Sequence, residues 1–232
     1  MVGKMKVMVA QIQTTTPTEI FYPDCDGQPM ANNTTQFRWI VAIKQNLERL
    51  FAGNPRVFIA GDLFWYPIEG RNTIAVAPDV MVVFDRPKGD RLSYKQWVEN
   101  NIPPQVIFEI LSPSNTKTEM DRKLLFFDRY GVEEYYIYNP DTNELRGWLR
   151  GEEGLDELDP IADWVSPRMG IRFDLSGEEL QFIGPDGRRF ISYAELDQML
   201  EEEQQRVEEE RQRAEEERQR AEEERQRAEE ER

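Results

Sequence analysis

The chain has 232 residues, a net charge of −16 and 39% hydrophobic residues, which is enough for one domain with a packed core plus an appendage. It contains no histidine and one cysteine, Cys25, which excludes histidine-based acid–base chemistry, histidine metal ligands, internal disulfides and cysteine-cluster zinc sites. No apolar run is long enough to span a membrane and no charged-then-apolar leader is present, so we expect a cytoplasmic protein without membrane contact.

The first third of the chain predicts one long helix between extended segments. Residues 5–13 are apolar enough for a strand, and residues 21–30 are loop-like because they are dense in Pro, Gly and Asp. A helix is predicted from Thr34 to Phe51, ended by Gly53-Asn54-Pro55. Its apolar positions recur at helical spacing: Phe37, Ile40, Val41, Ile43, Leu47 and Leu50.

The middle of the chain alternates strands with a second helix. Strands are predicted over 56–67, 74–85, 106–111 and 133–140, with a long polar connection over 86–104. The helix is predicted from Thr118 to Tyr130, because Thr118 and Asp121 resemble a capping box and Gly131 supplies a stop. Further short strands are predicted in ELRGWLR, MGIRFDL, LQFIG and RRFIS.

Residues 201–232 differ in composition from the rest of the chain. They contain fifteen Glu and eight Arg, and RQRAEEE occurs three times in succession. A stable coiled coil needs apolar residues at two positions of each heptad, and here each heptad offers one small apolar residue. The pattern therefore predicts a solvated helix supported by pairs such as Glu216–Arg220. A weak oligomerisation or docking helix is the alternative.

Glu109 stands out within QVIFEILSPSN because both faces of this strand are otherwise apolar. Val106, Phe108 and Ile110 point one way and Ile107, Glu109 and Leu111 the other, which is typical of a central strand covered on both sides. An ionised carboxylate is costly there unless a cation, a proton or strong donors meet it.

Asp79 is in a similar position within IAVAPDVMVVFD, on the face shared by Ala77, Met81 and Val83. If the two strands are neighbours, Asp79 and Glu109 converge and repel each other unless a divalent cation lies between them. In the absence of His and Cys ligands, Mg²⁺ or Mn²⁺ suits such a pair. The predicted helix starts soon after the Glu109 strand, so Lys123 could bring its ammonium group toward the pair and orient a water or stabilise a phosphoryl charge.

Three blocks carry a resemblance to a known family: PDVMVV (78–83), IFEILSPSN (107–115) and DRKLLFFDRYGVEEYYIYNP (121–140). In combination they resemble the Uma-two family of restriction-endonuclease-like proteins, within the PD-(D/E)xK nuclease superfamily, over roughly residues 17–175. The resemblance implies an α+β restriction-endonuclease-like core, a mixed sheet flanked by helices, and metal ligation by Asp79 and Glu109, with the Ile110 carbonyl as an additional candidate ligand.

One position departs from the superfamily pattern. A Lys is expected two residues after the Glu, and that position is Leu111. Families of this kind are thought to have moved the lysine to the following helix, which makes Lys123 the candidate.

Each residue also has a structural interpretation. Glu109 could pair with a buried Arg, Asp79 could cap a turn and Lys123 could lie on a helix surface. Asp62 could form a hydrogen bond at the end of a strand. Basic residues over 86–95 and around Lys123 could form a rim that attracts nucleic acid, or could be solvated surface groups.

The sequence thus predicts a restriction-endonuclease-like domain over 1–195 and a charged helical or weak coiled-coil tail over 196–232. The expected function is Mg²⁺- or Mn²⁺-dependent hydrolysis of phosphodiester bonds in nucleic acid, with DNA favoured. Asp79 and Glu109 would hold the metal and Lys123 would complete the catalytic site. A catalytically inactive scaffold that binds a protein partner through the tail is the alternative. The sequence leaves open whether the chain forms a homodimer.

Overall fold

The computed structural model describes residues 20–24, 31, 33–191 and 193–230. Three helices occur in this part of the chain: α1 (Thr34–Leu50), α2 (Lys117–Arg129) and α3 (Tyr193–Glu230). The strands are β1 (Val57–Gly61), β2 (Trp65–Tyr66), β3 (Val80–Phe84), β4 (Tyr94–Lys95), β5 (Val106–Ile110), β6 (Glu134–Asn139), β7 (Glu144–Arg150), β8 (Leu155–Glu157), β9 (Arg172–Asp174) and β10 (Gln181–Ile183).

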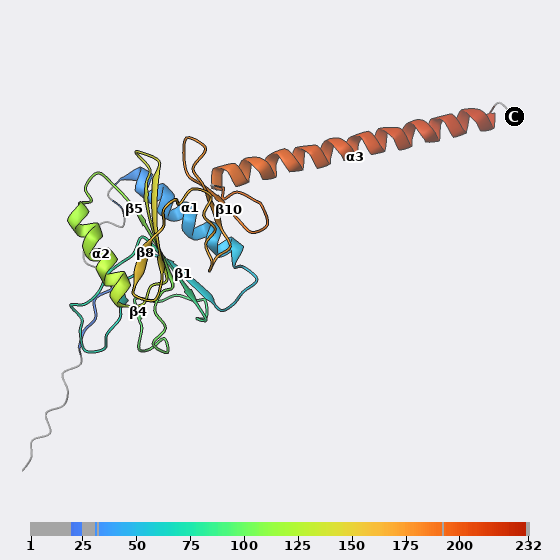
Figure 1. Ribbon diagram of the computed structural model, residues 1–232. Coiled ribbons are helices and arrows are strands. Elements are labelled where there is room, and N and C mark those ends of the chain that lie inside the picture. Colours follow the sequence, from blue (N-terminus) through green and yellow to red (C-terminus); the bar gives the residue numbers. More distant parts are fainter. Residues whose placement is uncertain (1–19, 25–30, 32, 192, 231–232) are drawn as a thin grey trace, which may run out of the picture.

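The main sheet has six strands in the order β1-β3-β5-β6-β7-β8. Only the β5–β6 pair is parallel, and α2 provides the crossover between these two strands. Two small sheets accompany it, a parallel β2–β4 pair and an antiparallel β9–β10 pair. The expected α+β class, with a mixed sheet flanked by helices and followed by a C-terminal helix, is confirmed, and β5 is a central strand as its two apolar faces predict (Figure 1).

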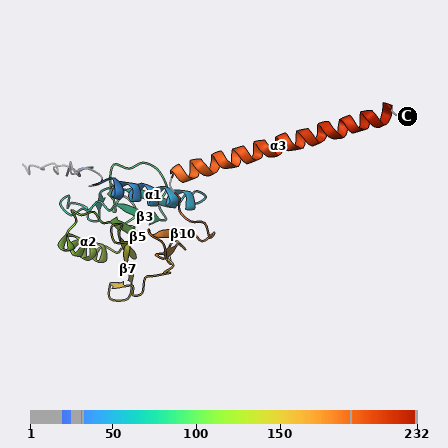
Figure 2. The same ribbon diagram turned by 90° about the horizontal axis from the view of Figure 1, so that it is seen from above.

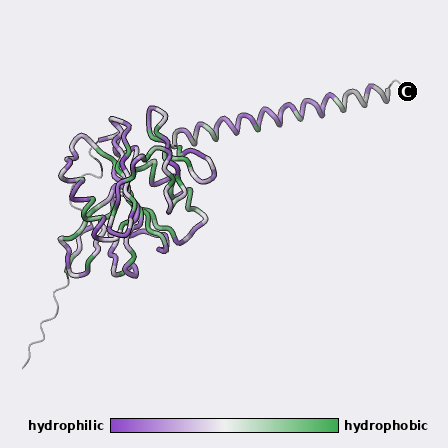
Figure 3. Tube along the Cα trace, viewed as in Figure 1, coloured by the Kyte–Doolittle hydropathy of each residue, from purple (hydrophilic) through white to green (hydrophobic). Residues whose placement is uncertain are grey.

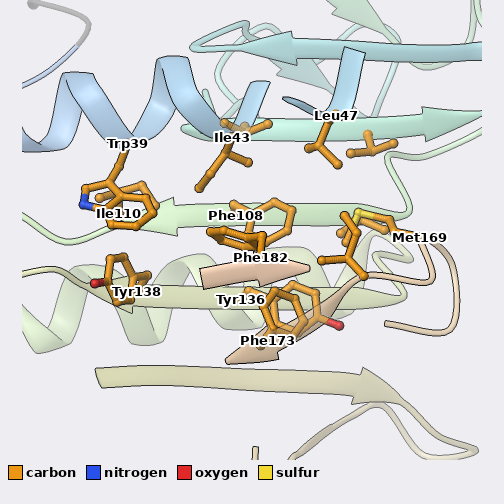
Figure 4. Close-up of a cluster of buried hydrophobic side chains, with 14 of the residues drawn as sticks. Trp39, Ile43, Leu47, Phe108, Ile110, Tyr136, Tyr138, Met169, Phe173 and Phe182 are labelled. Carbon is orange, nitrogen blue, oxygen red and sulfur yellow. The ribbon is translucent and has the colours of Figure 1, made fainter. Parts of the chain in front are cut away.

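One face of the sheet packs against α1 and the β9–β10 pair. Val106, Phe108 and Ile110 of β5 are on this face and at most 1% exposed. Figure 4 shows Trp39, Ile43 and Leu47 of α1 facing these strands, while Phe173 and Phe182 close the cluster from the β9–β10 side. The alternation predicted for β5 therefore places its even-numbered side chains in this core.

The opposite face packs against α2, so the sheet lies between the two helices (Figure 2). Ile107, Met81 and Tyr135 are fully buried there, together with Phe127 of α2. Glu109 has the same orientation as Ile107, because residues two apart in a strand share a face. The carboxylate of Glu109 is thus directed toward α2.

Several predicted boundaries are wrong. The helix α2 begins at Lys117, because the side chain of Thr116, and not that of Thr118, accepts the capping bond from the backbone N–H of Glu119. In α1, Phe37 is 49% exposed although its spacing placed it with the core positions. These two errors are local, since Ile40, Ile43 and Leu47 of α1 and Phe127 of α2 are buried.

The strand predictions also differ from the structure. The stretch 56–67 is divided into β1 and β2, and 74–85 is ordered as β3 only from Val80 onward. Strands β4 and β8 were not predicted, and RRFIS contributes an isolated bridge through Arg189 instead of a strand. The strand predicted over 5–13 and the single cysteine lie outside the described residues.

A second buried carboxylate, Glu134 at the start of β6, has a structural role. It is fully buried and accepts hydrogen bonds from the hydroxyls of Tyr136 and Ser166 and from the backbone N–H of Arg168. Three donors reach both oxygens of this carboxylate, so Glu134 connects the segment before β9 to the main sheet. Its register partner is Val106, at the opposite end of β5 from Ile110.

The helix α3 has 38 residues and extends away from the domain (Figure 1). Its described side chains beyond Gln198 are exposed, and Figure 3 shows it as mainly hydrophilic. The predicted pair of Glu216 with Arg220 is present at 3.8 Å. No helix in the described part of the chain combines the length and apolar character that crossing a bilayer requires.

Candidate active site

Asp79 lies directly before β3, where the pairing of β3 with β5 ends. Its Oδ2 atom accepts a hydrogen bond of 2.6 Å from the backbone N–H of Ile110. The carbonyl of Pro78 accepts a hydrogen bond from the backbone N–H of Asp62. The Asp79 carboxylate therefore accepts the bond from the Ile110 N–H in place of a backbone carbonyl. Asp79 is therefore no simple turn cap: it is 8% exposed and fastened to the neighbouring strand.

The strand register brings Asp79 and Glu109 together. Val80 pairs with Phe108 and Met81 with Ile107 in the antiparallel β3–β5 ladder. Continued by one residue, this register places Asp79 opposite Glu109, and directly opposed residues have Cβ atoms about 4.5–5.5 Å apart. The predicted convergence of the two carboxylates follows from this register.

Glu109 is 3% exposed and has one partner for its two oxygens. Its Oε2 atom accepts a hydrogen bond of 2.9 Å from the ammonium of Lys123, whereas Oε1 is buried and meets no donor among the described residues. The partner is thus a lysine of α2 and not a core arginine. A buried carboxylate oxygen without a donor is costly, so the site favours a cation or a proton there.

Lys123 is at the middle of α2 and points inward. Its side chain is 20% exposed, in contrast to 87% for Lys117 at the start of the same helix. The alternative of an ordinary surface lysine is therefore wrong for Lys123. The structure brings all three predicted residues, Asp79, Glu109 and Lys123, to one place.

Burial dominates the electrostatics of the two carboxylates. It raises the pKa of Glu109 to about 8; the ammonium of Lys123 opposes this rise and the charge of Asp79 adds to it. Burial likewise raises the pKa of Asp79, against the lowering effects of the Ile110 N–H and of Lys123. Two acids share one ammonium, and an additional positive charge would stabilise both in their ionised forms.

Lys123 stays cationic in this setting. Burial alone would lower its pKa, but Glu109, Asp79 and Glu119 together raise it above the usual value. A buried lysine surrounded by carboxylates remains a donor of up to three hydrogen bonds, one of which reaches Glu109.

The donor atoms fit a hard divalent cation. Asp79 and Glu109 offer carboxylate oxygens, and the Ile110 carbonyl keeps a lone pair although it accepts a bond of 2.9 Å from Gln36. In the part of the chain that the structure describes, no three His, Cys, Asp or Glu side chains form a closed cage. Such an open set of oxygens is typical of Mg²⁺, which keeps several waters and takes few protein ligands.

Gln36 is a site residue that sequence reasoning missed. Its Nε2 atom donates to the Ile110 carbonyl at 2.9 Å and to Asp79 Oδ2 at 3.5 Å, and it is 5% exposed. The signal was available, because Gln36 occupies the same helical stripe as Ile40 and Ile43, where a polar residue is unusual.

We expect Gln36→Leu to lower the free energy of unfolding by about 1–2 kcal/mol, because the buried Ile110 carbonyl loses its side-chain donor. Urea unfolding followed by circular dichroism measures the change. An unchanged midpoint would show that the bond contributes nothing to the fold. Because Asp79 keeps its bond from the Ile110 N–H, the carboxylate should stay near its present place.

The loop between β5 and α2 is closed by Asn115. Its Oδ1 atom accepts from the backbone N–H and the hydroxyl of Ser112, and its Nδ2 atom donates to both oxygens of Glu119 at 3.3 and 3.4 Å. Ser112 thus begins the turn that leads from β5 to α2. Glu119, which was not predicted as a site residue, lies four positions before Lys123 on the same helix.

The basic residues over 86–95 do not surround this site. They follow the far end of β3, five residues beyond Asp79, which corresponds to roughly 17 Å of strand. Arg91 pairs with Glu99 at 2.7 Å and Arg86 lies 3.7 Å from the same carboxylate. The interpretation of this segment as a basic rim around the acidic centre is therefore wrong.

Comparison with known proteins places the chain in a family. No curated protein matches it. A solved structure described as "a putative nuclease belonging to DUF820" from Anabaena variabilis is 13% identical, with a TM-score of 0.42, and the match covers 58% of this chain and 72% of that one. The model of the Uma2 (Uma-two) family, described as "Putative restriction endonuclease", matches residues 14–181. The chain therefore belongs to the Uma2 family.

Proposed function

We propose that this protein is a Mg²⁺- or Mn²⁺-dependent nuclease that hydrolyses phosphodiester bonds, with DNA as its substrate. The observation that carries the proposal is the convergence of Asp79, Glu109 and Lys123, with one ammonium for two buried carboxylates. The family's description as a restriction endonuclease supports the reaction class and the choice of DNA.

The position of each residue determines its proposed role. Asp79 and Glu109 would hold the cation, and the bond from the Ile110 N–H restricts the position of the Asp79 carboxylate. A bound divalent ion of this kind polarises a phosphoryl oxygen and lowers the pKa of its water. Lys123 has N–H donors beyond the one that meets Glu109, and its partial exposure lets them reach a water or a phosphate oxygen.

The direct test is cleavage of supercoiled plasmid and of a single-stranded oligonucleotide by the purified protein. We expect nicked or linear products with Mg²⁺ or Mn²⁺ and none after chelation by EDTA. If neither substrate is cut with either ion, the protein is no nuclease under these conditions and the scaffold alternative, binding a protein partner through α3, takes its place.

A second measurement tests the metal site without requiring cleavage. Mn²⁺ at a hundred times its dissociation constant should stabilise the folded protein by about 2.7 kcal/mol, because an ion that binds only the native state shifts the unfolding equilibrium. A thermal melt with and without Mn²⁺ shows this as a rise in Tm. The rise should vanish in the Asp79→Ala, Glu109→Ala double variant, and a rise of equal size there would place the ion elsewhere.

A further inference from the structure

Glu119 is a third carboxylate beside the Asp79–Glu109 pair, and the proposed function gives it no role. It lies in the first turn of α2, four residues before Lys123, and side chains at this spacing are neighbours on a helix surface. The charge of Glu119 acts on Lys123, on Glu109 and on Asp79. Glu119 and Glu109 are therefore two carboxyl groups near one ammonium group.

Asn115 holds Glu119 in place without saturating it. The two contacts from Asn115 Nδ2, at 3.3 and 3.4 Å, are longer than a typical N–H···O bond. Asn115 is itself fixed by the Ser112 backbone N–H at 2.9 Å. The carboxylate of Glu119 thus has a fixed location and lone pairs left to accept a further donor.

The ammonium of Lys123 already pairs with Glu109, one of the two residues proposed to hold the cation. Its ammonium is 2.9 Å from Glu109 Oε2, so a divalent ion bound by Asp79 and by the open Oε1 atom of the same Glu109 carboxylate would lie close to this positive charge. The repulsion between two cations at such a short distance in a largely buried site is strong. This repulsion favours a shift of the ammonium away from Glu109 when the ion enters, and a buried ammonium that shifts needs another anionic partner.

We propose that Glu119 is the positioning residue that receives the ammonium of Lys123 when Asp79 and Glu109 hold a divalent cation. The inference rests on the proposed function. In the cation-free protein Lys123 pairs with Glu109, and in the loaded protein it pairs with Glu119, one helical turn toward the start of α2. Glu119 is half-buried, as Lys123 is, so the ammonium remains partly shielded from solvent after the exchange.

Calorimetric titration of Mn²⁺ in a double-mutant cycle tests the exchange by equilibrium binding alone. Four proteins are compared at pH 7: the parent, Glu119→Gln, Lys123→Met and the double variant. We expect Glu119→Gln to weaken Mn²⁺ binding roughly five- to tenfold in the parent, at the lower end of the range for coupled sites, and to have no effect once Lys123 is Met. Asp121→Asn, an exposed change on the same helix, is the matched control and should leave the affinity unchanged.

The outcomes separate the alternatives. Equal weakening by Glu119→Gln in both backgrounds would show that Glu119 acts on the ion without Lys123, and no weakening in the parent would show that it takes no part; either result overturns the exchange. If the parent itself binds no Mn²⁺, the proposed function fails with it, which the first titration reveals. Lys123→Gln replaces Lys123→Met in the cycle if the latter does not fold.

Discussion

Glu109→Gln should reduce metal-dependent cleavage roughly a thousandfold or more, since loss of a ligand forfeits several kcal/mol of charge stabilisation in the transition state. The amide has the shape of the carboxylate and can still accept a hydrogen bond from Lys123, but it carries no negative charge. Because burial already raises the pKa of Glu109 to about 8, the neutral amide should fit the buried site without strain. Plasmid cleavage rates, measured beside the melting temperature, separate lost chemistry from lost folding.

Glu134→Gln provides the matched control, since it is the same substitution at another fully buried carboxylate of the same sheet. Glu134 lies at the opposite end of β5 from the site and accepts three hydrogen bonds from its own neighbours. We expect Glu134→Gln to lower stability while the cleavage rate of the folded protein stays near that of the parent. If Glu109→Gln cleaved as fast as Glu134→Gln, Glu109 would not be a metal ligand.

Lys123→Met should lower the free energy of unfolding by about 3 kcal/mol at pH 9, because it leaves the Glu109 carboxylate buried without its partner. This loss of unfolding free energy should become smaller as the pH falls. Without the ammonium, the pKa of Glu109 rises above its value in the parent, so the folded variant binds a proton that relieves the charge.

The direction in which stability changes with pH follows from proton uptake by Glu109. The pKa of Glu109 is raised in the folded protein, so between its ordinary value near 4.5 and about 8 the folded state binds more protons than the unfolded state. Stability that depends on Glu109 is therefore complete at low pH and is lost as the pH rises through this window. In Lys123→Met the decline should continue to higher pH than in the parent.

Urea unfolding at pH 6, 7.5 and 9 measures this dependence. Lys117→Met, at the exposed start of the same helix, is the control and should change little at any pH. A deficit in Lys123→Met that is equal at all three pH values would contradict a charge effect and indicate lost packing of the lysine stem instead.

The convergence of the site could be predicted because it depends on local alternation. Two runs of apolar residues, each interrupted by one acid, indicate two covered strands, and the short connection from Glu109 to α2 limits where Lys123 can lie. The register that sets Asp79 opposite Glu109 could not be read from either strand alone, because it is decided by pairing across the sheet.

Gln36 and Glu119 were missed for different reasons. Gln36 is 43 residues from Asp79 along the chain, and nothing in its own helix indicates which carboxylate it will meet. Glu119 was missed because an acidic residue in the first turn of a helix already has an ordinary structural role, in that it complements the helix dipole. The parallel pairing of β2 with β4 likewise depends on contacts that no short stretch of sequence specifies.

The helix α3 makes the molecule elongated. At 1.5 Å per residue its 38 residues reach about 57 Å, several times the radius of gyration of about 16 Å expected for a globular body of this size. The protein should therefore diffuse and elute from a sizing column as a larger particle than its mass suggests. Anything tethered at the outer tip of this helix would stand far from Asp79 and Glu109, so a label placed there would leave access to the acidic centre undisturbed.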